Sequence, residues 1–180
     1  SSSLIELAPP NIAVDKLISL LEGEGLTVDD VLAAIDKLGG KTVHVIGDTI
    51  VDSYTQTSMI GGQTKTPTIS VRYESQKNFV GGAGIVAKHL RAAGAEVKFT
   101  TILGDDQWNP FVTEDLESAG VEMNAITSGK RPTTNKNAIV CSGYRLLKVD
   151  TLDNRIISED IQHAFEDAIR NSPCDALVFS

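Results

Sequence analysis

Cysteine is scarce in this chain of 180 residues, which holds only Cys141 and Cys174. The two form no C-x-x-C pair and no histidine stands at ligand spacing beside them, so the sequence indicates neither a disulfide framework nor a zinc site. Free cysteines of this kind usually pack as small apolar side chains. A reducing, cytoplasmic setting is the expectation, and the start SSSLIELAPP lacks the basic and long apolar regions of a secretory signal.

Long apolar runs and basic clusters are also missing. No stretch approaches the roughly 20 apolar residues that a membrane-spanning helix needs. The net charge is -8 at pH 7, and the lysines and arginines do not cluster, although phosphate contacts require clustered basic residues. These absences argue against a membrane and against nucleic acid as the main partner.

Common phosphate-binding and catalytic motifs are absent too. There is no G-x-G-x-x-G and no G-x-x-x-x-G-K-[ST], so neither a dinucleotide fingerprint nor a Walker loop is predicted. His44, His89 and His163 are far apart in the sequence, and no Ser-His-Asp arrangement suggests itself. Each histidine is expected to be structural.

The acidity that is present is uneven. Residues 1–40 hold seven acidic side chains against two lysines, so 7 minus 2 leaves five of the eight excess negative charges there. Apolar residues recur at helical spacing in two stretches, and the second opens on the capping pair Thr27 and Asp30. We predict that residues 1–40 form a helical hairpin, a linker or appendage to a domain over residues 41–180.

Strands and helices alternate after Lys41. TVHVIGD, EVKFTTILG and VEMNAITS are predicted strands, with helices over about 79–94, 106–120 and 158–171. This order predicts an α/β fold with a Rossmann-like parallel sheet. CDALVFS begins one more buried strand in which the chain ends, so the domain is expected to be incomplete at its C-terminus.

Two exposed strand pairs interrupt this alternation. SYTQTSMIGG and TPTISVRYES have Thr-rich polar faces, and TNKNAIVCSG meets YRLLKVDT at a Ser142-Gly143 turn. We predict that the four strands form a small β-sheet lid from about residues 53–76 and 133–151.

Acidic residues follow two predicted strands, where an open parallel sheet binds its ligands. Asp48 and Asp52 follow the first strand, and Asp105 and Asp106 follow EVKFTTILG. A carboxylate can accept hydrogen bonds from two neighbouring sugar hydroxyls, and Asp52 is well placed to do so. The alternative is that these residues only cap a turn or the next helix.

Two further candidates lie beside the lid segments. Gly81 and Gly82 allow the backbone to approach a ligand at a helix N-terminus, although a structural turn is the alternative. Lys136 can reach a substrate phosphate, and the alternative is a solvated lysine of the lid.

The order of these features is more specific than any one of them. VHVIGDTIVDSY comes first, then the lid pair, then GGAGIVAKHLRAAGAEVKFTTILGDD, RPTTNKNAIV and YRLLKVD. Over about residues 41–180 this order resembles the PfkB/ribokinase family of carbohydrate kinases, and most of all the heptose-phosphate kinase branch that feeds ADP-heptose synthesis. The resemblance implies a ribokinase-like fold.

The resemblance also implies an activity, with ATP and Mg as cofactors of the complete kinase. Members of the family transfer the γ-phosphate of ATP to a sugar hydroxyl. Asp52 would hold sugar hydroxyls, Gly81 and Gly82 would bring the backbone against the sugar, and Lys136 would reach in from the lid. A homodimer through the β lid is implied as well.

The chain departs from the family pattern at two points. The family usually carries Asn where Ile85 stands, and isoleucine can neither donate nor accept a hydrogen bond. The N-x-x-E segment near magnesium, the G-x-G-D anion hole with the catalytic Asp, and the adenine-binding loops are expected beyond Ser180. No catalytic residue or metal ligand is therefore expected in this piece, and the piece alone is expected to be inactive.

Three hypotheses follow. The leading one is the sugar-binding half of an ATP-dependent kinase that phosphorylates a sugar or sugar phosphate, for instance a heptose phosphate. The second is a non-catalytic homologue that uses the lid for dimerisation or regulation, which Ile85 favours. The third is a nucleotidyltransferase with a kinase-like partner domain, because SSSLIE is similar to the end of cytidylyltransferase-like domains that occur fused to such kinases.

Overall fold

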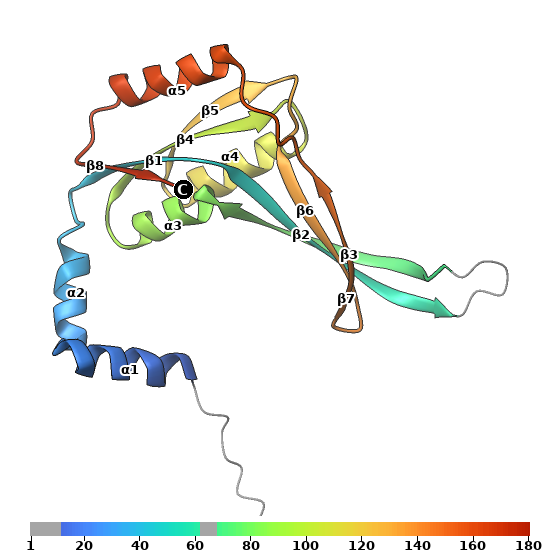
Figure 1. The fold of residues 1–180 in the computed structure, drawn as a ribbon, viewed down its shortest axis with the longest axis horizontal. Helices are drawn as coiled ribbons and strands as arrows, with labels where there is room; N and C mark the ends of the chain where they lie inside the picture. The colour runs from blue at the N-terminus through green and yellow to red at the C-terminus, as the bar shows by residue number, and fades with distance from the viewer. Residues whose placement is uncertain (1–11, 62–67) are drawn as a thin grey trace, which may run out of the picture.

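The computed structural model describes residues 12–61 and 68–180, so the SSSLIE segment lies outside the described residues. A four-stranded parallel sheet, here called the base sheet, confirms the predicted α/β fold (Figure 1). Its strand order is β5-β4-β1-β8. The strands are β1 (Thr42–Ile46), β4 (Glu96–Gly104), β5 (Glu122–Ser128) and β8 (Ala176–Phe179).

Three helices cover the base sheet. In Figure 1, α3 (Ala83–Ala92) and α4 (Trp108–Ser118) lie on one side, and α5 (Glu159–Asn171) lies on the other. Each helix was predicted within a few residues of these bounds. Among the described residues, none of the helices is both long enough and apolar enough to span a membrane.

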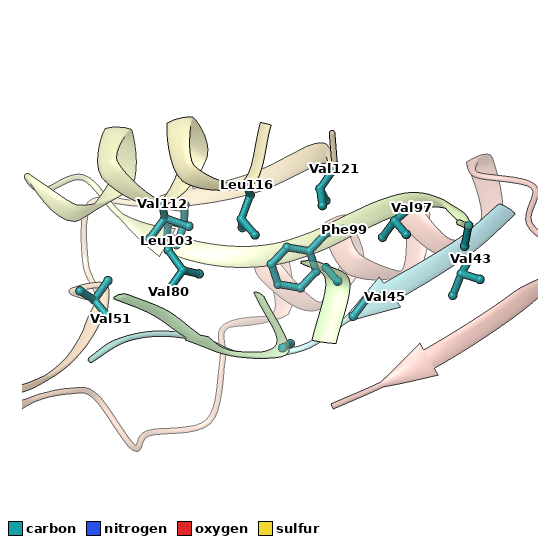
Figure 2. Close-up of a cluster of buried hydrophobic side chains, with 13 residues drawn as sticks. Val43, Val45, Val51, Val80, Val97, Phe99, Leu103, Val112, Leu116 and Val121 are labelled. Carbon is teal, nitrogen blue, oxygen red and sulfur yellow. The ribbon is translucent and has the colours of Figure 1, made fainter. Parts of the chain in front are cut away.

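The hydrophobic core lies between the base sheet and helices α3 and α4 (Figure 2). Alternate residues of the strands point into it, as the two-residue period of a strand requires. Small residues in α3 let that helix approach the sheet closely. The fully buried members include Val45, Phe99, Ala87, Val112 and Leu116.

A second four-stranded sheet, here called the lid sheet, extends away from the base (Figure 1). Its order is β3-β2-β6-β7, with β2 and β6 parallel and the other pairs antiparallel. The predicted lid strands are confirmed, but β2 and β3 reach further toward the base than predicted. The strands are β2 (Thr49–Gly61), β3 (Ser70–Gly82), β6 (Thr134–Cys141) and β7 (Tyr144–Thr151).

The two predicted N-terminal helices are present as α1 (Ile12–Glu24) and α2 (Val28–Asp36). The capping box of α2 is formed: the Asp30 backbone N–H donates to Thr27 Oγ1 at 3.1 Å, and the Thr27 N–H donates to the Asp30 carboxylate at 2.8 Å. The helices meet at an elbow in Figure 1 rather than lying side by side, so the hairpin geometry differs from the expectation. Most of their apolar side chains are exposed, and the division of the chain at residue 40 stays a prediction.

Candidate functional site

A cavity of about 550 Å³ lies where the lid sheet leaves the base sheet. Asp48, at the carboxyl end of β1, lines it from the base, and Lys136 in β6 lines it from the lid. This is the edge of a parallel sheet at which ligands bind. The remaining lining residues are Thr49, Ile50, Ile102, Arg131, Pro132, Thr134, Asp150, Leu152, Asp153, Asn154, Arg155 and Ile157.

Asp52 lies inside strand β2, so it does not cap a turn as the alternative proposed. It is half-buried and pairs with Phe79 of β3 on one side and Lys136 of β6 on the other. Directly paired residues point to the same face of a sheet, so the carboxylate and the lysine share the face that borders the cavity. Asp52 itself is not among the lining residues, but Lys136 and Ile50 on that face are.

Gly81 and Gly82 are the last residues of strand β3, and each is needed for a close contact. A Cβ on Gly81 would lie 2.4 Å from Oδ2 of Asp52, so the carboxylate occupies the space of a side chain. Gly82 has φ 58°, and a Cβ there would lie 2.4 Å from the backbone oxygen of Asp48. The pair therefore lets β3 pack against Asp48 and Asp52, and this close packing by itself explains why both positions are glycine.

Lys136 is half-buried and stands between two carboxylates in the lid sheet. Its register partners are Asp52 of β2 and Asp150 of β7, and all three point to the cavity face. A lysine ammonium at a cavity wall can bind a hydroxyl or an anionic group. The structure thus brings together Asp52, Gly81 and Lys136, which are far apart in sequence.

The N-cap residue of α4 is Gln107, so Asp106 lies one position before the cap. Its carboxylate accepts a hydrogen bond from the backbone N–H of Trp108 at 3.0 Å, in the first turn of α4, and another from the N–H of Thr133 at 2.8 Å. Asp105 is exposed. Neither residue lines the cavity, whereas Asp48 does.

The sequence reasoning missed a cluster on the other side of the cavity, formed by Arg131, Asp153 and Arg155. The Asp153 carboxylate accepts from Nε of Arg155 at 2.9 Å and from Nη2 of Arg155 at 2.6 Å. Nη2 of Arg131 lies 3.5 Å from the same carboxylate. Hydrogen bonds from Arg155 are the main reason that the pKa of Asp153 lies well below its usual range.

A signal for part of this cluster was present in the sequence. Asp153 accepts from the backbone N–H of Arg155 at 2.9 Å, which is the Asx turn that an Asp-Asn-Arg segment favours. The contact with Arg131, 22 residues earlier, depends on the tertiary structure. Among the described residues, no group of three or more His, Cys, Asp or Glu side chains is placed to hold a metal ion.

The chain is similar in sequence to bifunctional proteins from two bacteria. The bifunctional protein HldE of Rhodopseudomonas palustris (strain TIE-1) is 32% identical over 142 residues, which are 76% of this chain and 29% of that protein. HldE of Wolinella succinogenes is 31% identical over 144 residues, with 77% and 30% covered. The chain therefore spans less than a third of these relatives.

Solved structures share the fold. The phosphofructokinase-2 from Escherichia coli in complex with fructose-6-phosphate superposes with a TM-score of 0.59 at 19% identity, covering 78% of this chain and 45% of that one. A carbohydrate kinase from Agrobacterium tumefaciens gives 0.56 at 21% identity, with 77% and 45% covered. At these identities the likeness establishes the ribokinase-like fold alone.

A family model described as pfkB family carbohydrate kinase matches residues 41–168. The matched segment begins just before β1, contains both faces of the cavity and ends within α5. Because the match covers most of the chain, it establishes what the order of motifs indicated: the chain belongs to the pfkB family of carbohydrate kinases.

Proposed function

We propose that this chain is the sugar-binding part of an ATP-dependent carbohydrate kinase that phosphorylates a sugar or sugar phosphate, with a heptose phosphate as the first substrate to test. The observation that carries the proposal is the cavity between base and lid, with Lys136 on its wall and Asp52 on the same face. Carboxylates and a lysine at one cavity edge match the hydroxyls and the phosphate of such a substrate.

Asp52 has the central role in this proposal. Gly81 leaves room for its carboxylate, so the group can accept hydrogen bonds from two adjacent hydroxyls without moving the strand. Asp48 offers a second carboxylate from the base, and Lys136 contributes a positive charge from the lid. The substrate would thus be held from both sheets.

ATP and magnesium are proposed as cofactors of the complete kinase. In the part of the chain that the structure describes, no group of three or more His, Cys, Asp or Glu side chains is placed to hold a metal ion. We place the catalytic Asp, the anion hole and the nucleotide site in a further part of the domain. This 180-residue piece is accordingly proposed to bind the sugar without transferring phosphate.

Ile85 stands where the family usually carries Asn, and it is not among the residues that line the cavity. It stands in the first turn of α3, directly after the Gly81-Gly82 close approach, and 38% of its surface is exposed. An isoleucine there cannot hydrogen-bond a sugar hydroxyl. It favours, modestly, the alternative that the chain is a non-catalytic homologue.

We also propose that two copies associate through the lid. The face of the lid sheet opposite Asp52, here called the outer lid face, carries exposed apolar side chains. An apolar sheet face of this kind marks an interaction site. Its exposed residues are Met59, Tyr73, Tyr144, Leu147 and Val149.

The dimer is tested by sedimentation of Leu147→Glu, which places a charge on the outer lid face. We expect the wild-type protein to be a dimer and Leu147→Glu to dissociate it. Ile156→Glu, which changes an exposed apolar residue outside the lid, is the control and should leave the dimer intact. A monomeric wild-type protein, or a Leu147→Glu dimer of unchanged affinity, would contradict the proposal.

The substrate proposal is tested by Asp52→Ala in the full-length protein. Calorimetric titration with a heptose phosphate and with fructose 6-phosphate should show affinity reduced at least about tenfold, because removing a charged hydrogen-bond acceptor costs this much or more. Asp105→Ala, an exposed carboxylate outside the cavity, is the matched control. Unchanged affinity in Asp52→Ala would leave Asp52 with a purely structural role.

A further inference from the structure

The chain crosses twice between the base and the β6–β7 half of the lid. Residues 129–133 lead from β5 into β6, and residues 152–158 lead from β7 to α5. Arg131 of the first crossing donates from Nη2 to the backbone oxygen of Asp153 in the second, at 3.0 Å. Both side chains of this pair are mostly buried, with 14% of Arg131 and 10% of Asp153 exposed.

The second crossing is held locally by Asp153. Its carboxylate receives the backbone N–H and the side chain of Arg155, while Arg131 also donates to the backbone oxygen of Arg155. Arg155 itself is largely exposed. Asp153 is therefore the residue that both arginines contact. Its pair with Arg131 is mostly buried, and a buried charge pair is costly to break on one side only.

The first crossing is fastened to the base as well. Oγ1 of Thr133 accepts from the backbone N–H of Gly104, at the end of β4, at 2.8 Å. The N–H of Thr133 donates to Asp106, and Thr133 is only 2% exposed. The contacts of Thr133 fix the first crossing to β4, and the Arg131–Asp153 contact fixes the second crossing to the first. We call these contacts together the hinge clamp.

The hinge clamp lies close to two cavity residues. Lys136 lies in β6, three residues after Thr133 of the first crossing. Asp150 lies in β7, three residues before Asp153 of the second crossing. The two are register partners and both line the cavity. A strand advances by a fixed rise per residue and alternates its side chains, so the position of its root sets where Lys136 stands relative to Asp48 on the base.

We propose that Asp153 is a positioning residue, which acts through Arg131 to hold the root of β6 and β7 so that Lys136 faces the cavity. This inference rests on the proposed function only in the assumption that Lys136 binds a substrate in the cavity. The clamp itself is independent of any substrate.

Asp153→Asn in the full-length protein tests the clamp without a ligand. The change keeps the shape and removes the charge that the two arginines share. Hydrogen exchange followed by mass spectrometry should be about tenfold faster in peptides covering residues 129–137 and 148–155, while β1 and β4 are unchanged. Asp175→Asn is the matched control, because Asp175 also accepts an ion pair, from Lys41 at 3.1 Å, and a backbone N–H, but at the other end of the base sheet.

The reactivity of Lys136 is the second readout, and a merely structural role would not change it selectively. Acylation of Lys136 by acetic anhydride should become about threefold faster in Asp153→Asn, whereas Lys148, which is exposed on the same hairpin, should react as before. Asp153→Glu, which restores the charge, should return the Lys136 rate toward that of the wild type. Arg131→Gln combined with Asp153→Asn should add little to either single change.

Two results would overturn the inference. One is an Asp153→Asn protein whose exchange and Lys136 reactivity equal those of Asp175→Asn. The other is faster exchange across the base and the lid alike, which would make Asp153 a residue of global stability. Failure of the wild type to bind heptose phosphate or fructose 6-phosphate would count against the proposed function. It would not affect the test of the hinge clamp, because hydrogen exchange and Lys136 acylation are both measured without a ligand.

Discussion

The base sheet and the lid sheet have the same number of strands, but different interactions hold them together. The base is parallel and is covered by helices, and nearly the whole hydrophobic core belongs to it. The lid contributes only Val51 and Val80, at its root, to that core. Beyond the root, most buried side chains of the lid are polar, and several bond to one another across the strands. Ala138 and Cys141 are the buried apolar exceptions.

This difference indicates that the base and the lid are stabilised in different ways. A core of close-packed apolar side chains makes the base a rigid platform. A single layer of strands held by hydrogen bonds gains less from burial, so its position depends on its root and on whatever covers its faces. Residues of the cavity come from both sheets, so the cavity spans the close-packed base and the single-layered lid.

The largest effect that separates the two sheets is expected from matched phenylalanine truncations. Phe99→Ala in β4 should reduce the free energy of unfolding by about 3–5 kcal/mol, because Phe99 is fully buried. Phe79→Ala in β3 should cost about 1 kcal/mol or less, since Phe79 is largely exposed and mainly contacts Tyr54. Urea denaturation measures both. Equal costs would mean that the lid has a core of its own.

A smaller effect is expected from Gly81→Ala, where the lid meets the candidate site. The new Cβ would lie 2.4 Å from Oδ2 of Asp52, so the carboxylate must move, at a cost of about 2 kcal/mol in unfolding free energy. In an Asp52→Ala background the same change should cost much less, because the clash is gone. If the costs of Gly81→Ala and Asp52→Ala in unfolding free energy were additive, a contact other than that with Asp52 would account for the cost of Gly81→Ala.

The polar ladder of the lid is tested by Asn135→Ala. Asn135 is buried, and its Nδ2 donates to the backbone oxygen of Val51 at 3.0 Å and to Oγ of Ser53 at 2.7 Å. Leaving these acceptors unsatisfied should cost about 1.5 kcal/mol. Asn124→Ala is the control in the base, where an exposed amide donates to Thr100 at 3.2 Å. A larger cost at Asn124 would reverse the expected order.

The smallest effect concerns the base and depends on pH. His44 is buried, its Nε2 lies 2.8 Å from Oγ1 of Thr100, and Nδ1 has no partner among the described residues. Burial, with a smaller contribution from Lys98, lowers the pKa of His44 below its ordinary value of 6.5. The unfolded chain therefore takes up a proton first, and stability is complete above pH 6.5 and decreases as the pH falls below it.

His44→Gln should flatten this dependence between pH 7 and pH 5, because glutamine does not titrate. His89→Gln, at an exposed position, should retain it. Thermal denaturation at several pH values is the measurement. Parallel curves for the wild type and His44→Gln would assign the acid sensitivity to other groups.

Much of the fold was predictable from local patterns. The β-branched run at β1, the capping pair at Thr27 and the turn at Ser142-Gly143 each indicate one element, and each element is present. The start of β2 was missed, because Asp48 and Asp52 suggested a loop where the chain only bends before it continues into the lid. Polar residues in a strand that borders a cavity carry no local signal of strand structure.

Candidate residues could be selected one by one from the sequence, but their arrangement could not be predicted. Asp52, Gly81, Gly82 and Lys136 were selected for their chemistry and their order, and their roles as sugar ligands stay predictions. The cluster around Asp153 was missed because its partner Arg131 lies in a different crossing. Long-range pairs of this kind depend on strand register, which a single sequence does not reveal.

The sequence by itself determined the elements and the family of this protein, because hydrophobic period, turn residues and motif order are local properties of the chain. The tertiary structure alone decided that Asp52 rests against Gly81, that Lys136 pairs with Asp52, and that Arg131 meets Asp153. Each of these contacts joins residues that are distant in sequence, so it exists only once the sheets have paired and the two crossings have been brought together.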